Sequence, residues 1–459
     1  MVTITSSYTI VPNEPTPNGR LGLSSNDQVV RLTHASTIYV YKTNPSLELI
    51  ERMRDSLHKI LVHYYPVAGR LRWTKGGRFE LDCNAKGVVF LEAESTKTLS
   101  EYGDFTPNEA IKDLMPSVDY TKPIEDLPLL LVQLTRFCGH GTTTTDQGIT
   151  IGVLWSHPMT DGFAFIRFIN TWAKAARGEP LEIDELFPLL DRSIIESPHP
   201  SSAPRFDHPE LKPFPLVLGS SDDIAEKKKK TVAVTLKLTS QQVEKLKKKA
   251  NDQSQKEGSR PYSRFEVIAA YIWRCASKAR QLDQLQPTQV RFVVDIRSRL
   301  NPPLSQNYFG NALSSTVTPT CCVGDIISKP LSYVAQKIKE AADLIQNEYI
   351  RSQQCLIMGH EQLDEIRTSF QFEGEQRKNS PFYGNPNLSI VSWINLKWYD
   401  ADFGWGKPMH FGPAPLCPSD RAFIIRNMDD SIIISLHFQI AHMQLFTKFF
   451  WEEMLDSKL

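Results

Sequence analysis

Apolar residues in the first half of the chain are spaced as in alternating helices and strands. Residues 48–63 show a helical period, and Pro66 and Gly69 are expected to end that helix. Residues 149–157 alternate as in a strand, and the period after Asp161 becomes helical again. The apolar face of the strand is formed by Ile149, Ile151, Val153, Trp155 and His157. We therefore expect His157 at the end of a strand that leads through a chain reversal into a helix.

The second half begins after a proline-rich connector. Six prolines between residues 196 and 215 exclude a regular helix or a central strand there. Residues 231–238 then alternate as in a strand, and Thr239 with Gln242 suits the capping box of the next helix. Lysines 227–230, 245 and 247–249 are expected to be solvated.

Length and composition favour a two-domain globular protein. A chain of 459 residues exceeds what one core usually supports, and we expect domains at 1–195 and 231–459 with a crossover linker at 196–230. The formal net charge is zero, so no overall field favours nucleic acid or an anionic membrane as a partner. The seven cysteines form no C-x-x-C pair, so we expect neither a disulfide framework nor a bound metal. No secretory signal or membrane-length apolar run is seen, which predicts a cytoplasmic protein.

His157 is the candidate catalytic residue. A lone histidine that points inward is usually a core residue, but Asp161 follows four positions later. A carboxylate at a chain reversal can pair with an arginine and hold the imidazole in one pose, as general base catalysis requires. The sequence has no G-x-S-x-G elbow for a nucleophilic serine. The simplest chemistry is therefore direct attack of an acceptor, deprotonated by His157, on an activated acyl group.

A second motif, Asp402-Phe403-Gly404-Trp405-Gly406, makes this interpretation specific. Its two glycines indicate a tight loop defined by the backbone. In this order, His157–Gly162 and Asp402–Gly406 resemble the motifs of the plant BAHD acyl-CoA-dependent acyltransferases, over nearly the whole chain. Four further stretches share this likeness: residues 23–27, residues 64–70, Asp295–Arg299 and Asn307–Asn311.

The resemblance implies an α/β fold of two chloramphenicol-acetyltransferase-like domains with a solvent channel between them and His157 at its middle. It implies that Asp161 pairs with an arginine, for which Arg297 and Arg299 are the candidates. The loop with Asp402, Gly404, Trp405 and Gly406 would be structural, and a segment near 385–410 would return to the first half. Ser263 and Arg264 would contact CoA, although Arg264 could equally be a plain surface residue. The family implies a monomer that uses acyl-CoA as co-substrate and has no bound cofactor.

Asn395 gives information about the chemical class of the acceptor. Family members that acylate shikimate or quinate have an arginine at this place in a Ser-Trp-x-Arg stretch, where it holds a carboxylate. Residues 7–12, 69–73, 77–81 and 381–388 look most similar to the spermidine hydroxycinnamoyl transferases of this family. Those enzymes join a hydroxycinnamoyl group to a polyamine and form a phenolamide. The remaining acceptor-side candidates are His34, Thr37, Tyr39 and Trp393, with a core position for Tyr39 equally open. Carboxylates that could recognise the amine are guessed from position alone as Glu373, Glu375 and Asp420.

Two alternatives remain open from the sequence. An ester-forming family member could acylate an alcohol or alkaloid acceptor. A non-catalytic relative could use the same fold to bind a partner, although His157 and Asp161 argue against it.

Overall fold

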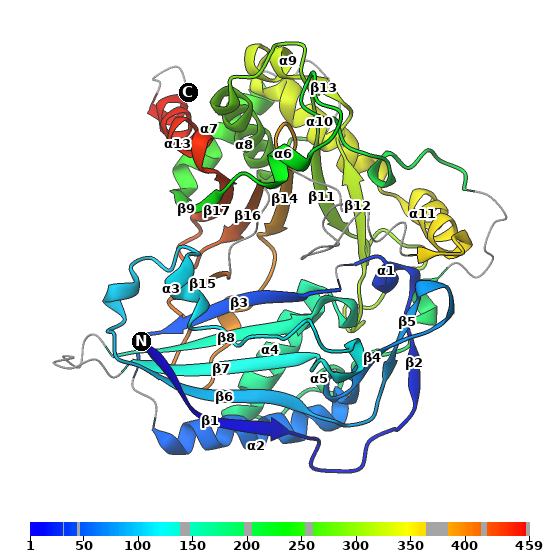
Figure 1. Cartoon of the computed structure of the whole chain (residues 1–459), viewed down its shortest axis with the longest axis vertical. Helices are drawn as coiled ribbons and strands as arrows, with labels where there is room; N and C mark the ends of the chain where they lie inside the picture. The colour runs from blue at the N-terminus through cyan, green and yellow to red at the C-terminus, as the bar shows by residue number, and fades with distance from the viewer. Residues whose placement is uncertain are drawn as a thin grey trace.

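The computed structural model describes residues 1–30, 32–43, 46–137, 147–196, 204–252, 260–363, 384–414 and 420–455. The chain forms two α/β halves, each built on a six-stranded sheet, and this confirms the predicted fold class (Figure 1). The solvent channel between the halves stays a prediction. Among the described helices, none has both the length and the apolar character needed to cross a bilayer.

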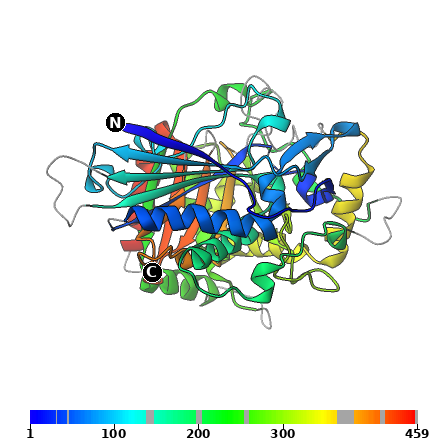
Figure 2. The same ribbon diagram turned by 90° about the horizontal axis from the view of Figure 1, so that it is seen from below.

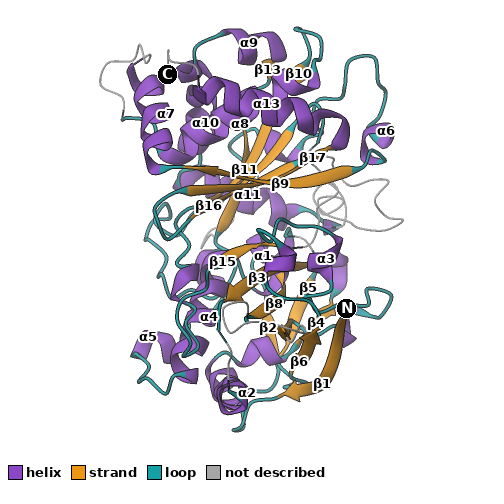
Figure 3. Ribbon diagram, turned by 90° about the vertical axis from the view of Figure 1, so that its left-hand side faces the viewer, coloured by secondary structure: helices purple, strands orange, loops and turns teal. Residues whose placement is uncertain are grey.

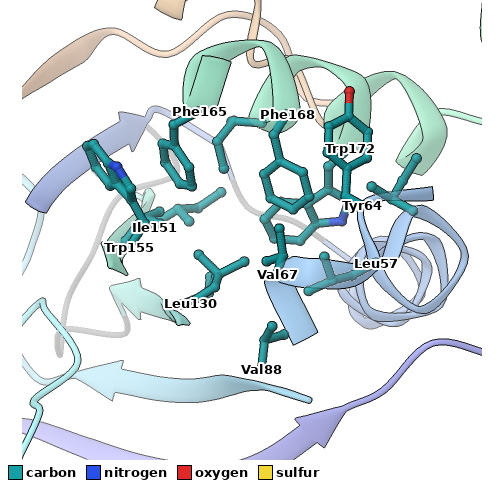
Figure 4. Close-up of a cluster of buried hydrophobic side chains, with 14 of the residues drawn as sticks. Leu57, Tyr64, Val67, Val88, Leu130, Ile151, Trp155, Phe165, Phe168 and Trp172 are labelled. Carbon is teal, nitrogen blue, oxygen red and sulfur yellow. The ribbon is translucent and has the colours of Figure 1, made fainter. Parts of the chain in front are cut away.

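The first sheet carries two long helices on one face. Helices α2 (Leu47–His63) and α4 (Gly162–Ala176) pack against each other and cover the apolar side of the strands (Figure 2). In order across the sheet, the strands are β1 (Val2–Ile10), β6 (Val88–Ser95), β7 (Leu130–Phe137), β8 (Ile149–Ser156), β3 (His34–Tyr41) and β15 (His410–Pro413). Figure 4 shows the core between this face and the helices, where Trp155 lies beside Phe165 with ring centroids 4.0 Å apart.

The second sheet has helices on the face turned away from the first half (Figure 3). Its strands, in order, are β12 (Leu313–Val317), β11 (Val290–Asp295), β14 (Leu388–Trp393), β16 (Arg421–Arg426), β17 (Ile432–Gln439) and β9 (Thr231–Leu238). The helices of this half are α7 (Ser240–Asp252), α8 (Arg264–Arg280), α9 (Val323–Ser328), α10 (Leu331–Leu344), α11 (Asn347–Gly359) and α13 (Ile440–Leu455).

Smaller elements complete the described chain. Two small sheets are formed by β2 (Arg20–Gly22), β5 (Phe79–Asp82) and β4 (Arg70–Trp73), and by β10 (Pro287–Thr288) with β13 (Cys321–Cys322). The short helices are α1 (Ser25–Gln28), α3 (Glu109–Lys112), α5 (Ile183–Leu186) and α6 (Ile224–Lys227).

The helices and strands predicted from apolar spacing are confirmed, with one correction at His157. Strand β8 ends at Ser156, and residues His157–Met159 form a 3₁₀ turn. His157 therefore does not continue the inward face of the strand. Pro158 explains the early end of β8, because it has no N–H to donate to a neighbouring strand. The capping box before α7 is present as predicted, with Thr239 and Gln242 bonded reciprocally.

The connector is tied to the second half by a buried polar cluster. His208 contacts the Ser352 Oγ and a Glu210 carboxylate oxygen, each at 2.9 Å. Glu210 also accepts hydrogen bonds from Tyr349 and Gln353 of α11. These contacts fix this described part of the connector against α11.

One segment of the second half returns to the first sheet. Strand β14 stays in the second sheet, but β15 pairs with β3, with Phe411 opposite Tyr39. The return therefore falls within residues 394–413, which overlaps the later part of the predicted segment near 385–410 and ends slightly beyond it.

Candidate active site

His157 lies in the turn that joins β8 to α4. Its side chain is half-buried, whereas Pro158, Met159 and Thr160 are buried. The backbone N–H of His157 donates to the Thr33 carbonyl, and its carbonyl accepts from Thr160. The imidazole is thus attached to a short, rigid turn between two buried elements.

Asp161 fixes the end of this turn. It is the N-cap of α4 and accepts from the Ala164 N–H at 2.9 Å. Its other carboxylate oxygen accepts from the Ala312 N–H and pairs with Arg297, both at 2.9 Å. Burial alone would lower the pKa of Arg297, but the charges of Asp161 and Asp295 raise it above its ordinary value. Because its carboxylate is engaged in these contacts, Asp161 can hold the turn but is not placed to exchange protons with substrate.

The second arginine candidate, Arg299, is not the partner of Asp161. Its guanidinium donates to the carbonyls of Ala342 and Ile345 at 2.6 and 2.8 Å. These carbonyls lie at the end of α10, where a helix leaves its last C=O groups without partners. Arg299 therefore caps a helix, whereas Arg297 reaches the turn.

Three buried residues that the sequence did not single out also surround the turn. Asn311 donates to the His157 carbonyl at 2.9 Å, and Arg192 donates to the Met159 carbonyl at 2.9 Å. Asp27 accepts from the side chain of Asn311 at 2.8 Å. Asp27 and Asn311 fall within stretches that carried the family resemblance, and that was the available signal.

The loop at Asp402 lies away from His157. The Asp402 carboxylate accepts from the N–H groups of Gly404 and Gly406 at 2.8 and 2.9 Å, and both glycines have positive φ angles. Trp405 packs edge-on against Tyr41. Tyr41 is at the opposite end of β3 from His34, which pairs with Ser156 beside His157. Seven residue steps along β3 separate these ends by roughly 20 Å.

The predicted CoA contacts lie at the start of α8. The Ser263 hydroxyl accepts from the Glu266 N–H in a capping box. Arg264 contacts Glu244 at 3.3 Å and Asp430 at 3.5 Å. A CoA phosphate would have to compete with these two carboxylates for Arg264. Contact of either residue with CoA stays a prediction.

The acceptor-side candidates on β3 divide between its two faces. Burial lowers the pKa of His34 to about 4, and its ring nitrogens contact the Tyr120 hydroxyl and the Pro128 carbonyl. Thr37 and Tyr39 share the opposite face and are buried. No described residue gives a hydrogen-bond partner to either hydroxyl. Burying a hydroxyl without a partner is costly, so these two groups are suited to a polar ligand or water.

Trp393 and Asn395 lie where the two halves meet. Trp393 packs against Phe411, with ring centroids 5.5 Å apart, and Phe411 packs against Tyr39 at 4.8 Å. Asn395 is exposed in the turn after β14. The next residue, Leu396, faces Gly162 at the start of α4, where an added Cβ would lie 3.7 Å from its Cδ1. The structure thus brings this turn beside the segment that begins at His157.

Asp420 was wrongly chosen as a carboxylate for amine recognition. It is fully buried, pairs with Arg280 at 2.6 Å and accepts from the Gln439 N–H. These contacts hold β16 and β17 to α8, so the carboxylate is not available to a substrate. Glu373 and Glu375 lie outside the described residues.

Comparison with known proteins identifies the family. A profile of the Transferase family matches residues 1–453. The chain belongs to this family of BAHD acyltransferases. It is 43% identical to the hydroxycinnamoyl-CoA:piscidic acid hydroxycinnamoyltransferase of Actaea racemosa, over 99% of this chain and 100% of the relative.

Two further comparisons extend the BAHD assignment. The chain is 34% identical to the hydroxycinnamoyl-CoA:5-hydroxyanthranilate N-hydroxycinnamoyltransferase of Avena sativa, over 98% of this chain and 99% of the relative. The crystal structure of vinorine synthase has the same fold, with a TM-score of 0.69, 22% identity, and coverage of 97% of this chain and 96% of that one. The protein is thus an acyl-CoA-dependent BAHD acyltransferase with acyl-CoA as its co-substrate.

For this BAHD enzyme we expect Asp402→Ala to reduce the yield of folded protein and the melting temperature without raising KM for either substrate. The substitution leaves the N–H groups of Gly404 and Gly406 without their shared acceptor. Thermal unfolding and steady-state kinetics on the soluble fraction would measure both effects. The matched control is Asp400→Ala in the same segment, because Asp400 is exposed and its contact with Lys407 is long, at 3.9 Å. A raised acceptor KM with unchanged stability would contradict a structural role.

Proposed function

We propose that the protein transfers a hydroxycinnamoyl group from CoA to an amine nitrogen of a polyamine such as spermidine, with His157 as general base. The donor class is supported by the names of both relatives, which specify hydroxycinnamoyl-CoA. One of the two is an N-transferase, so amide formation has a precedent in the family.

In the proposed reaction, the acceptor nitrogen attacks the thioester carbonyl and forms a C–N bond. His157 takes the proton that the nitrogen loses. The C–S bond then breaks, and the proton passes from His157 to the departing CoA thiolate. A polyamine nitrogen is mostly protonated at neutral pH, since alkylammonium groups have pKa values of about 10. An uncharged acceptor surface would favour the neutral form that can attack.

The main support for a polyamine acceptor is that residue 395 is an asparagine. It stands where family members specific for shikimate or quinate carry an arginine, and it adds no positive charge to the turn beside Gly162. A carboxylate acceptor would lack its bidentate anchor, whereas a polycation would meet no repulsion from this position.

The hydroxyls of Thr37 and Tyr39 support the same class of acceptor. Both are buried, uncharged and without a partner among the described residues. Hydroxyl oxygens accept hydrogen bonds from an amine N–H. Trp393 and Phe411 beside Tyr39 offer aromatic surface, to which a cationic nitrogen is attracted.

Ester formation on a hydroxy acid is a second candidate. It is favoured by the 43% identity to the relative named for piscidic acid. This candidate requires some cation other than residue 395 to hold the acid.

Product analysis would separate the two candidates. Coumaroyl-CoA or feruloyl-CoA would be incubated with spermidine, shikimate or a simple alcohol, and the products identified by mass spectrometry. We expect amide with spermidine and little ester with shikimate. Faster formation of the shikimate ester would overturn the argument from Asn395.

The Asn395→Arg variant tests the same position directly. We expect it to lower kcat/KM for spermidine by about tenfold or more and to raise it for shikimate, because one charge pair of modest strength is worth about 1.4 kcal/mol, or a factor of ten. Asn395→Gln is the matched control, since it keeps a neutral amide and should leave the acceptor preference unchanged. Equal effects of the arginine and glutamine variants would show that charge at this position is irrelevant.

A further inference from the structure

The turn that carries His157 is held largely by residues from other parts of the chain. The turn itself belongs to the first half, between β8 and α4. Its fixed points on the second half are Arg297 and the segment Gly310–Ala312, which lie after β11 and before β12. Its position therefore depends on how the second half is seated against the first.

Within that segment, Asn311 makes the most direct contact with His157. Its side-chain amide donates to the His157 carbonyl at 2.9 Å and, more weakly, toward the Pro158 carbonyl at 3.4 Å. The same amide donates to Asp27 at 2.8 Å, and the backbone N–H of Asn311 donates to the same carboxylate oxygen at 2.8 Å. The orientation of the amide is settled by these contacts, because the flipped group would point its oxygen at two acceptors.

Asp27 is in turn fixed by its own surroundings. Its second carboxylate oxygen accepts from the N–H and the hydroxyl of Ser24, at 3.0 and 2.7 Å. Arg192 lies 3.5 Å from the oxygen that Asn311 uses. Asp27 is fully buried and Asn311 is fully buried as well. Such a buried charge-assisted network has little freedom to relax.

We propose that Asn311 is a positioning residue, held by Asp27, that sets the place of the His157 imidazole relative to the reacting groups. The inference rests on the proposed role of His157 as general base. Asn311 bonds to the backbone of His157 and so acts through it. Without this bond the His157 carbonyl keeps the hydrogen bond from the Thr160 N–H within its own turn but loses its contact with the second half, and the imidazole can shift. A displacement of about 1 Å can cost about 10²-fold in rate.

The test is a double-mutant cycle with Asn311→Ala and His157→Ala. Asn311→Ala is expected to lower kcat by about 10–100-fold and to leave KM for the acyl-CoA within about twofold. In the His157→Ala background the same change should alter the residual rate by less than about twofold, because there is no imidazole left to misplace. A purely structural effect of Asn311→Ala would lower the rate by the same factor in both backgrounds and would overturn the proposal.

Two further variants distinguish a loss of positioning from a loss of folding. Asn307→Ala is the matched control, because Asn307 lies shortly before Gly310–Ala312 in the chain, is half-buried, and donates to the Phe187 carbonyl rather than to the turn. It should leave kcat unchanged. Asn311→Asp preserves the size and shape of the side chain. A proton shared between the introduced carboxyl group and Asp27 can replace the hydrogen bond to Asp27, but it cannot replace the one to the His157 carbonyl. We expect it to regain stability but not kcat; recovery of both would overturn the proposal. If His157→Ala alone kept full activity, the proposed function would fail instead, so the two failures are distinguishable.

Discussion

Replacing His157 by alanine is expected to lower kcat by about 10²–10⁴-fold, the usual contribution of a general base, while the protein stays folded. The side chain is only half-buried, and the contacts that hold its turn are made by the backbone of residue 157 and by Asp161. Removal of the imidazole therefore leaves these backbone and Asp161 hydrogen bonds in place. The measurement is the rate of thiol release from hydroxycinnamoyl-CoA in the presence of spermidine, together with thermal unfolding.

His58→Ala serves as the control for this experiment. His58 lies on helix α2 and contacts only the Val11 carbonyl among the hydrogen bonds described for its ring. Its loss should leave the rate of transfer unchanged. If His157→Ala transfers the acyl group as fast as the unaltered protein, His157 is not the base and the proposed mechanism is wrong.

Asp161→Ala is expected to cost both stability and activity. The substitution leaves the buried Arg297 without its nearest carboxylate and removes the N-cap of α4. Breaking a buried pair by removing one partner costs about 3–5 kcal/mol, because an uncompensated charge remains inside. The midpoint of chemical denaturation should fall accordingly, and transfer should be nearly abolished in whatever protein remains folded.

Asp295→Asn tests whether the effect of Asp161→Ala comes only from losing a negative charge near Arg297. Asp295 also contacts Arg297, at 3.3 Å, but its side chain is 44% exposed and it does not cap the turn. Its neutralisation should cost about 1 kcal/mol or less, as for other partly exposed pairs. If both substitutions had the same effect, the special position of Asp161 at the start of α4 would be unimportant.

Local patterns in the sequence predicted local structure well. The period of residues 48–63 gave a helix at Leu47–His63, and Thr239 with Gln242 formed the expected capping box. These features depend on neighbours a few positions apart, so a single sequence contains the information needed. The early end of β8 was missed because the position of His157 fits the alternation of Ile151, Val153 and Trp155, while Pro158 removes the N–H that a longer strand would need.

The support of the site was harder to predict, because it is made by residues far apart in the chain. The bond between Asp27 and Asn311 spans 284 positions, and no local period indicates it. Arg297 and Arg299 are two residues apart and chemically identical, and only the fold decides that one reaches Asp161 and the other caps α10. The position of Asp420 suggested an acceptor contact, whereas the buried partner Arg280 gives it a structural role.

The pairing of β3 with β15 has a consequence for how the chain is made. Strand β3 leaves the ribosome early and β15 very late, yet the two are neighbours in the finished sheet. Until His410–Pro413 have been synthesised, one edge of β3 presents unpaired N–H and C=O groups beside apolar side chains. Such an edge readily pairs with other chains and leads to aggregation. The first half therefore cannot reach its final fold during most of translation. A truncated chain that ends before residue 410 would keep the unpaired, aggregation-prone edge of β3.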